Sequence, residues 1–297
     1  MRVLLIAGGW SSEREVSLNG AKEIQKALQN LGHETIFFDL SPQLDLLIQK
    51  ARQSDVAFIN LHGSPGEDGT IQALLEDIGL PYQGSGPKAS FLALNKAISK
   101  QIFVNHGLPT PDWSIYTGRT DFIPQNLTFP LVLKPNTGGS SLGIKIVHSS
   151  DELKKLAHSL NNQEFLLEQF IPGQELTCGV LDNQALPPVL IRPQKGAFFD
   201  YQSKYDPDGA EEICPAPISK TLAQKLMDMA LKAHRSLGLK DYSRTDFIVD
   251  EEENIYILEV NTLPGMTKTS LLPKAAKAFG LSFEELIDKL ISLALRK

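Results

Sequence analysis

The first third of the chain alternates short apolar runs with an amphipathic segment, and this pattern constrains the fold more than any other feature. We expect strands over residues 3–7, 35–38 and 56–60, and a helix over residues 17–31 that ends at Gly32. Strands that alternate with helices form parallel sheets, because each helix returns the chain to the same end of the sheet. The sequence therefore predicts a parallel α/β unit at the N-terminus.

Composition and cysteine usage exclude several classes of protein. The 297-residue chain has 29 lysines and arginines against 35 aspartates and glutamates, and a formal net charge of −6 disfavours general nucleic-acid binding. Its apolar runs are too short for a membrane span, and the first is too short for a signal peptide. Cys178 and Cys214 show no CxxC spacing, so a reducing cytoplasm fits better than a disulfide framework. The histidines are scattered, so a divalent metal would need oxygen ligands.

A loop of small residues lies between two predicted strands in the middle of the chain. Six of the eight residues in 136–143 are Gly, Ser or Thr, between strands expected over 131–134 and 144–147. Backbone N–H groups and hydroxyls in such a loop can wrap phosphates, and Lys134 can add a positive charge. Strand–loop–strand differs from the strand–loop–helix of Walker and dinucleotide sites. This difference, together with the missing GxGxxG pattern, argues against a Rossmann-type dehydrogenase.

The remaining elements are read from periodicity and capping signals. An irregular segment over residues 193–217 carries an aromatic cluster and is expected to act as a lid. Lys96 and Lys100 lie four apart on a predicted helix, and taken alone both would be expected on the solvated surface. The expected helices cover residues 88–104, 149–160, 219–237, 271–279 and 283–295, and the expected strands cover 165–169, 176–181, 188–191, 245–249 and 255–260.

The C-terminal hairpin carries the strongest local signal for chemistry. Its two strands flank an acidic turn, and counting outward from that turn sets Asp246 roughly opposite Glu259. Asn261 lies two positions after Glu259 and therefore on the same face, and Arg244 shares the face of Asp246. Two carboxylates and an amide suit Mg²⁺, and Arg244 could meet an anion beside it. The alternative is a solvated, charged face on an edge hairpin.

Two further candidates follow strands of the parallel unit, at the carboxyl end where open α/β sheets bind ligands. Glu13 follows the first strand and would suit a substrate ammonium group, or else stabilise a helix N-terminus. His62 follows the third strand and could orient a substrate, with a purely structural histidine as the alternative. Glu168 and Glu175 flank a turn, where they could receive an adenosine or be edge-strand charges.

In their order along the chain, these motifs resemble the ATP-grasp superfamily and, within it, the D-alanine–D-alanine ligases. The resemblance covers essentially the whole chain, although Asn95 stands where the family commonly has Asp and Thr245 where it usually has an aliphatic residue. The matching runs are residues 13–18, 62–63 with 66–69, 134–135 with 139–143, 168–173, 200–205, 242–246, 258–262, 264–267 and 270–276.

The resemblance implies a fold and a reaction. The fold would be α/β, and α+β overall, with a Rossmann-like substrate domain over residues 1–84 and an ATP-grasp fold over residues 85–169 and 170–297. Proteins of this family use ATP to join two D-alanines through an acyl phosphate for peptidoglycan precursor synthesis. A cytoplasmic homodimer would be expected, with no nucleic-acid or membrane partner.

On this resemblance, one group of residues would bind the nucleotide and its metals. Glu168 would face the adenine and Glu175 the ribose. Two Mg²⁺ ions, or Mn²⁺ in their place, would be held by Asp246, Glu259 and Asn261. The phosphates would meet lysines and loop hydroxyls, namely Lys96, Lys134, Lys204, Ser140 and Ser141.

A second group of residues would handle the substrates. Glu13 would pair with the ammonium group of the first D-alanine and connect through Ser140 to Tyr205 in the lid. Arg244 and the N–H group of Gly265 would stabilise the oxyanion of the tetrahedral intermediate. His62 would lie near the carboxylate of the first D-alanine. Ser270 and Leu271 would contact the carboxylate of the second D-alanine.

Three alternatives stay open at this point. A D-alanine–D-lactate or D-alanine–D-serine ligase would differ in the acceptor pocket, and the tyrosine at position 205 favours the dipeptide product. Another ATP-grasp carboxylate–amine ligase would share the mechanism. A catalytically silent relative would be expected to have lost part of the set Arg244, Asp246, Glu259 and Asn261, and this chain keeps all four.

Overall fold

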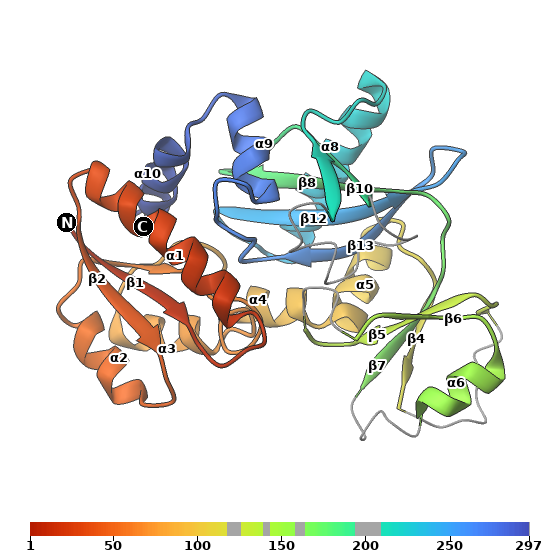
Figure 1. Ribbon diagram of the computed structural model, residues 1–297, viewed down its shortest axis with the longest axis horizontal. Helices are drawn as coiled ribbons and strands as arrows, with labels where there is room; N and C mark the ends of the chain where they lie inside the picture. Colours follow the sequence, from red (N-terminus) through yellow and green to blue (C-terminus); the bar gives the residue numbers. More distant parts are fainter. Residues whose placement is uncertain (118–125, 139–142, 158–163, 194–208, 297) are drawn as a thin grey trace.

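The computed structural model describes residues 1–117, 126–138, 143–157, 164–193 and 209–296, which form three β-sheets with helices around them (Figure 1). The N-terminal sheet has the strand order β2-β1-β3, and its strands are parallel. The predicted parallel unit is confirmed, with α2 and α3 in addition to the expected helix. Its elements are β1 (Arg2–Gly8), α1 (Arg14–Asn30), β2 (Glu34–Leu40), α2 (Leu44–Ala51), β3 (Val56–Ile59) and α3 (Thr70–Ile78).

Helix α1 begins at Arg14, three residues before the predicted start at Ser17. Ser17 is instead buried inside the helix, where its hydroxyl accepts a hydrogen bond from the Gly8 amide at 2.8 Å and donates one to the Asn60 carbonyl. The Asn60 side chain in turn donates to the Ser17 carbonyl at 2.7 Å. These bonds tie α1 to the carboxyl ends of β1 and β3, and so fix the start of the loops that follow both strands.

The second sheet is antiparallel and has the order β4-β7-β5-β6. β5 and β6 form the predicted hairpin, whose connecting residues 139–142 lie outside the described part of the chain. The Ser149 hydroxyl accepts from the Glu152 amide at 3.3 Å at the start of α6, as predicted, and the expected helix end at residue 160 also lies outside the described residues. The elements are β4 (Trp113–Tyr116), β5 (Leu131–Pro135), β6 (Lys145–Val147), α6 (Ser150–Ala157) and β7 (Phe165–Gln169).

The third sheet is also antiparallel and has the order β11-β10-β8-β12-β13, with β9 paired to β8. β11 falls inside the segment that was expected to be irregular, so that prediction was wrong for these residues. Their strand conformation comes from pairing with β10, which local sequence does not reveal. The elements are β8 (Gln174–Leu181), β9 (Gln184–Ala185), β10 (Val189–Pro193), β11 (Ala210–Ile213), α8 (Lys220–Ser236), β12 (Tyr242–Val249) and β13 (Ile255–Asn261).

The single helix predicted over residues 88–104 is two helices, α4 (Pro87–Leu94) and α5 (Lys96–Asn105). Asn95 between them has an extended backbone, with φ −80° and ψ 101°, and its side-chain oxygen accepts from the Ile98 amide at 3.1 Å. An asparagine that caps the second helix in this way ends the first. The turn directs α5 between the second and third sheets (Figure 1).

The chain ends beside the place where it begins (Figure 1). α9 (Leu271–Phe279) and α10 (Phe283–Ala294) follow the third sheet, and α10 packs against α1. Leu290 of α10 is fully buried in the same apolar core as Ile24 of α1. The predicted capping box at Ser282 is confirmed. The C-terminal helices therefore complete the core of the N-terminal sheet and hold it against the rest of the molecule.

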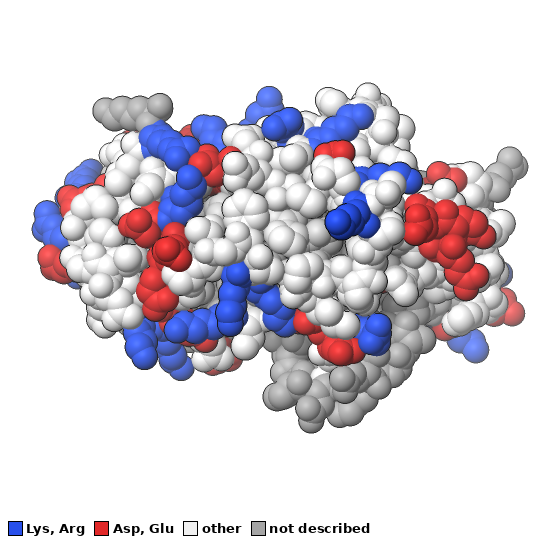
Figure 2. Space-filling view, turned by 90° about the horizontal axis from the view of Figure 1, so that it is seen from above, with Lys and Arg blue, Asp and Glu red and all other residues white. Residues whose placement is uncertain are grey.

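The sheets follow one another in sequence, and the predicted domain boundaries at residues 84 and 169 each fall between two sheets. The division into three domains stays a prediction. Among the described residues, no helix is long and apolar enough to cross a membrane. Figure 2 shows basic and acidic side chains interspersed over one face of the molecule.

Candidate active site

Two neighbouring strands of the third sheet bring together the polar residues of the C-terminal hairpin. β12 and β13 pair antiparallel, with Asp246 opposite Glu259 and Arg244 opposite Asn261. The register shifts between Asp246 and Phe247; without that shift, pairing that continued regularly from the turn would leave Asp246 one position out of line with Glu259. The predicted pairing is therefore confirmed, and it sets two carboxylates, a guanidinium and an amide within one small area.

Asp246 is buried and accepts four hydrogen bonds from side chains. Arg244 donates two of them, from Nε to Oδ1 and from Nη2 to Oδ2, each at 2.8 Å. Thr177 of β8 donates to Oδ1 at 2.7 Å, and Asn261 donates to Oδ2 at 3.2 Å. Burial by itself would lower the pKa of Arg244, but Asp246 and Glu259 raise it above its ordinary value. The guanidinium therefore stays charged, and within the described residues three of its five N–H donors have no hydrogen-bond partner.

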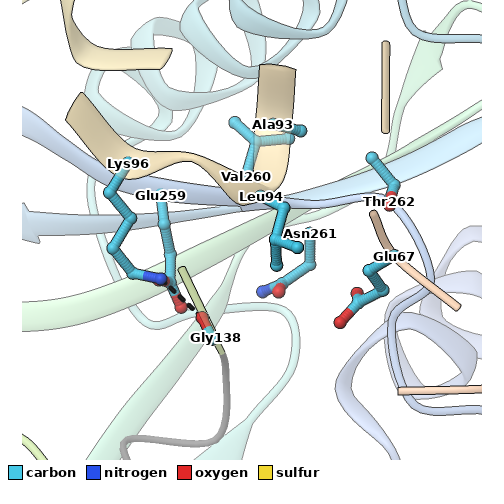
Figure 3. A pocket seen from close by; sticks show the side chains of 9 residues that line it. All are labelled: Glu67, Ala93, Leu94, Lys96, Gly138, Glu259, Val260, Asn261 and Thr262. Atoms are coloured by element: carbon cyan, nitrogen blue, oxygen red, sulfur yellow. Dashed lines mark hydrogen bonds and ion pairs between the residues drawn. The ribbon is translucent and has the colours of Figure 1, made fainter. Parts of the chain in front are cut away.

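A small pocket opens beside this group, and Figure 3 shows the side chains that line it. Lys96 Nζ lies 3.2 Å from a Glu259 carboxylate oxygen and donates to the Gly138 carbonyl at 2.6 Å. Asn261 and Glu67 point into the same pocket (Figure 3). Lys96 is only 6% exposed. Its position on a helix had suggested a solvated lysine, and that prediction was wrong. The turn at the end of α4 makes Lys96 the first residue of α5 and directs it inward.

A buried cluster of charges lies between α5 and the second sheet. Glu168 of β7 pairs through one carboxylate oxygen with Lys100 of α5, and through the other with Lys134 of β5 at 2.5 Å. Burial lowers the pKa of Lys100 to about 8, against the opposing effect of Glu168. Burial would raise the pKa of Glu168, but the two lysines hold it below its ordinary value. Lys100 was expected on the surface, and the structure corrects this: it is 0% exposed because Glu168 supplies an internal counter-charge.

The loops after β1 and β3 lie against each other, as expected for the carboxyl ends of adjacent parallel strands. Glu13 precedes α1 and is buried, with a carboxylate oxygen 3.6 Å from the position that a Cβ on Gly63 would take. His62 Nδ1 lies 3.1 Å from the Leu263 carbonyl. Because that carbonyl can only accept, the ring proton is on Nδ1. Burial lowers the pKa of His62 although Glu13 opposes it, so the ring is neutral at pH 7.

Glu67 is a second buried acid beside these loops, and its carboxylate accepts a hydrogen bond from the Gly63 amide at 2.8 Å. Burial, reinforced by the charge of Glu13, raises the pKa of Glu67 to about 7. Two carboxyl groups thus lie close to one buried imidazole. A cationic group that entered here would be attracted to both.

The loop after β13 folds back over the start of α9. A Cβ on Gly265 would lie 3.0 Å from Ser270 Oγ, so a larger residue would force that contact apart. The Ser270 hydroxyl accepts from the Thr267 amide at 3.1 Å, and Leu271 is the first residue of α9. The structure therefore brings Gly265, Ser270 and Leu271 to one place, at a helix N-terminus with exposed N–H groups.

Known proteins match this chain in sequence over nearly its whole length. Residues 43–85 match the family described as D-ala D-ala ligase N-terminus, and residues 102–292 match D-ala D-ala ligase C-terminus. A D-alanine–D-alanine ligase from Nitratidesulfovibrio vulgaris strain DP4 is 54% identical over 299 residues, which cover 99% of this chain and 98% of the relative. This chain belongs to the D-alanine–D-alanine ligase family.

Solved ligases share the fold over the full length. The D-alanine–D-alanine ligase from Bacillus anthracis complexed with ATP superposes with a TM-score of 0.88 at 36% identity, covering 100% of this chain and 98% of that one. The VanG D-Ala:D-Ser ligase from Enterococcus faecalis gives a TM-score of 0.83 at 27% identity, with 99% of each chain covered. The predicted ATP-grasp fold is confirmed by these ligases.

Some residues to which the ligase resemblance assigns a role cannot be placed. Ser140, Ser141, Lys204 and Tyr205 lie outside the described residues. Glu175 lies on β8 of the third sheet, opposite Ile191 and Ile248, and Glu168 lies on β7 of the second sheet. The adenine and ribose contacts expected of Glu168 and Glu175 stay predictions.

Sequence reasoning missed two residues of the ligase site, Glu67 and Lys100. Glu67 stands in one of the runs that match the family, between Gly66 and Asp68, but nothing local distinguishes a buried acid from a solvated one. Lys100 has the spacing of a surface lysine relative to Lys96. A signal was nevertheless present, since Glu67 stands in the glycine-rich loop that begins with His62 and is therefore a candidate for the same site.

Glu67 gives the ligase a pH-dependent stability that a neutral isostere should abolish. Because the pKa of Glu67 is raised from 4.5 to about 7, the unfolded chain loses this proton first as pH rises, and the free energy of unfolding falls between those values. Replacing Glu67 by Gln should remove this loss, so the variant should gain stability relative to the parent from pH 4.5 to 7, by up to about 3 kcal/mol. Above pH 7 the difference should be constant.

Urea unfolding at several pH values measures this difference. Glu251→Gln on the exposed β12–β13 turn is the matched control and should leave the pH profile of unfolding unchanged. A Glu67→Gln variant whose stability follows pH in parallel with the parent would contradict the assignment.

Proposed function

We propose that this chain is an ATP-dependent D-alanine–D-alanine ligase that forms D-alanyl-D-alanine, ADP and phosphate for peptidoglycan precursor synthesis. The observation that carries the proposal is the paired set on β12 and β13, where Arg244 and Asp246 lie opposite Asn261 and Glu259. Identity of 54% to a curated ligase over nearly the whole chain supports the same activity. The ligase from Bacillus anthracis was solved with ATP, which supports ATP as the nucleotide.

The first step joins the carboxylate of one D-alanine to the γ-phosphate of ATP. A carboxylate oxygen attacks the γ-phosphorus, the bond to the bridging oxygen of ADP breaks, and an acyl phosphate results. Two anions must meet, so the site has to supply positive charge. Lys96 and Lys134 would supply it at the phosphates, with Ser140, Ser141 and Lys204 added from the segments around them. Glu168 and Glu175 would contact the adenine and the ribose, which holds the nucleotide in one orientation.

The residues on β12 and β13 fit divalent metal ions. Within the described part of the chain no group of three or more His, Cys, Asp or Glu side chains could hold a metal ion, so Asn261 is needed beside Asp246 and Glu259. Carboxylate and amide oxygens are ligands that Mg²⁺ prefers, and Mn²⁺ accepts the same set. Of the bonds to Asp246, that from Asn261 is the longest at 3.2 Å and the easiest to exchange. Bound there, two metal ions would neutralise the phosphate charge and align the transferred group.

In the second step, the amine of the other D-alanine attacks the acyl carbon. The carbonyl oxygen becomes negative, and the remaining N–H groups of Arg244 with the Gly265 amide would stabilise it. Collapse of the tetrahedral intermediate forms the peptide bond and expels phosphate. Ser270 and Leu271, at the start of α9, would hold the carboxylate of the second D-alanine.

Glu13 would fix the first D-alanine by pairing with its ammonium group, beside His62, which would lie near its carboxylate. A chain of hydrogen bonds from Glu13 through Ser140 to Tyr205 would connect this substrate to the phosphate loop and the lid. Within the predicted lid of residues 195–217, closure of the part that precedes β11 would keep water from the acyl phosphate. A D-serine-using ligase shares the fold at 27% identity, so the acceptor is the property most open to variation. We also propose a homodimer, from the frequency of two-fold assemblies.

The reaction can be tested with a panel of acceptors. With ATP, Mg²⁺ and D-alanine, phosphate release should match the amount of D-alanyl-D-alanine formed. D-alanine with D-lactate should give little depsipeptide, and L-alanine should give no product. ATP cleavage that occurs only with another carboxylate–amine pair would overturn the substrate, and no cleavage with any pair would support the silent relative.

Glu259→Gln tests the metal-binding role of the hairpin. The substitution keeps the shape but removes a negative charge, so turnover should fall by at least about 100-fold. Glu253→Gln, on the exposed turn of the same hairpin, should retain turnover. Thermal unfolding should be similar in both variants, and a Glu259→Gln variant that keeps most of its activity would refute the metal assignment.

A further inference from the structure

Lys100 is fully buried, and several groups surround its ammonium group. Its side chain is 0% exposed and pairs with Glu168. The ammonium group also donates to Thr110 Oγ1 at 2.5 Å and lies 3.5 Å from the Ile257 carbonyl on β13. The Trp113 ring lies 6.0 Å from the same ammonium group. A lysine enclosed in this way acts only through its neighbours.

The neighbour that matters is Glu168, because the same carboxylate holds Lys134. Lys134 is 5% exposed, whereas Glu168 is 2% exposed and Lys100 fully buried. The three side chains carry two positive charges and one negative charge, since the pKa of Glu168 is held below its ordinary value. The surplus of one positive charge lies on the side of Lys134. Without Lys100, Glu168 would neutralise Lys134 and the surplus would vanish.

Stability alone does not explain the cluster. Buried ion pairs contribute little net stability, because desolvation offsets the attraction, and apolar replacements of similar volume are often neutral or stabilising. The cluster also spans three elements, α5, β5 and β7, and Lys100 reaches β13 through the Ile257 carbonyl. The cluster therefore sets the electrostatic environment of Lys134 on the second sheet.

We propose that Lys100 is a positioning residue for the nucleotide: it balances the charge of Glu168 and so leaves the positive charge of Lys134 for the phosphates of ATP. This inference rests on the proposed function, in which Lys134 binds phosphate. It adds a residue with no ligand contact of its own. It also gives the Glu168 side chain an electrostatic role in addition to the proposed contact with the adenine.

A double-mutant cycle of ATP binding tests the proposal, with Lys100→Met, Glu168→Gln and the double variant measured by calorimetry in the presence of Mg²⁺ and without D-alanine. Lys100→Met should weaken ATP binding by about tenfold, which corresponds to the loss of one charge interaction. The double variant restores the surplus of one positive charge, and Gln keeps an oxygen that can accept a hydrogen bond from the adenine, so this variant should bind ATP more tightly than Lys100→Met. Adenosine, which lacks phosphates, should bind the parent and Lys100→Met equally.

Each outcome decides the question. If Lys100 were merely structural, the double variant would bind ATP as weakly as Lys100→Met or more weakly, and adenosine binding would fall with it. Unchanged ATP binding by Lys100→Met would also overturn the proposal. If Lys100→Met does not fold, the double variant, in which Lys134 is the one remaining charge of the cluster, decides by comparison with the parent and Glu168→Gln. Lys88→Met, at an exposed position on α4, is the matched control. A parent protein that does not bind ATP would refute the proposed function instead.

Discussion

The position of β12 between β8 and β13 is the constraint on which the rest of the site depends. Asp246 lies in this strand and accepts a hydrogen bond from Thr177 of β8 on one side and from Asn261 of β13 on the other. A slip of one residue in either pairing would turn side chains to the opposite face and separate the carboxylates. The apolar core behind the sheet prevents such a slip, because Phe247 and Ile257 are fully buried in it. The shape of the polar site is therefore set by apolar packing on the other face.

Helix α5 connects this sheet to the second one through charge. Lys96 and Lys100 lie one turn apart on it, and they pair with Glu259 of the third sheet and Glu168 of the second. Both sheets thus present a carboxylate that is balanced from the same helix. The N-terminal loops are joined to the site by a separate contact, between His62 and the Leu263 carbonyl just after β13. Polar contacts thus join the N-terminal loops, helix α5 and the two antiparallel sheets.

Sequence reasoning located the elements and the opposed carboxylates well, and it failed where long-range contacts decide. Counting along the hairpin is a local operation and places Asp246 within one position of Glu259, and the register shift after Asp246 brings the two into line. The break at Asn95 was missed because an asparagine in the middle of a helical pattern is ambiguous until its cap is seen. The burial of Lys100 could not be predicted, since its partner Glu168 lies 68 positions away in sequence. β11 likewise depends on β10 for its conformation.

In the proposed reaction, the site activates a carboxylate by transferring phosphate to it. D-alanine labelled with ¹⁸O in its carboxyl group tests this directly, with mass analysis of the phosphate released during turnover. If a carboxylate oxygen attacks the γ-phosphorus, that oxygen leaves with the phosphate, so each phosphate should carry one ¹⁸O atom. Phosphate without label, formed alongside the dipeptide, would show that the carboxylate is activated by another route and would contradict the account.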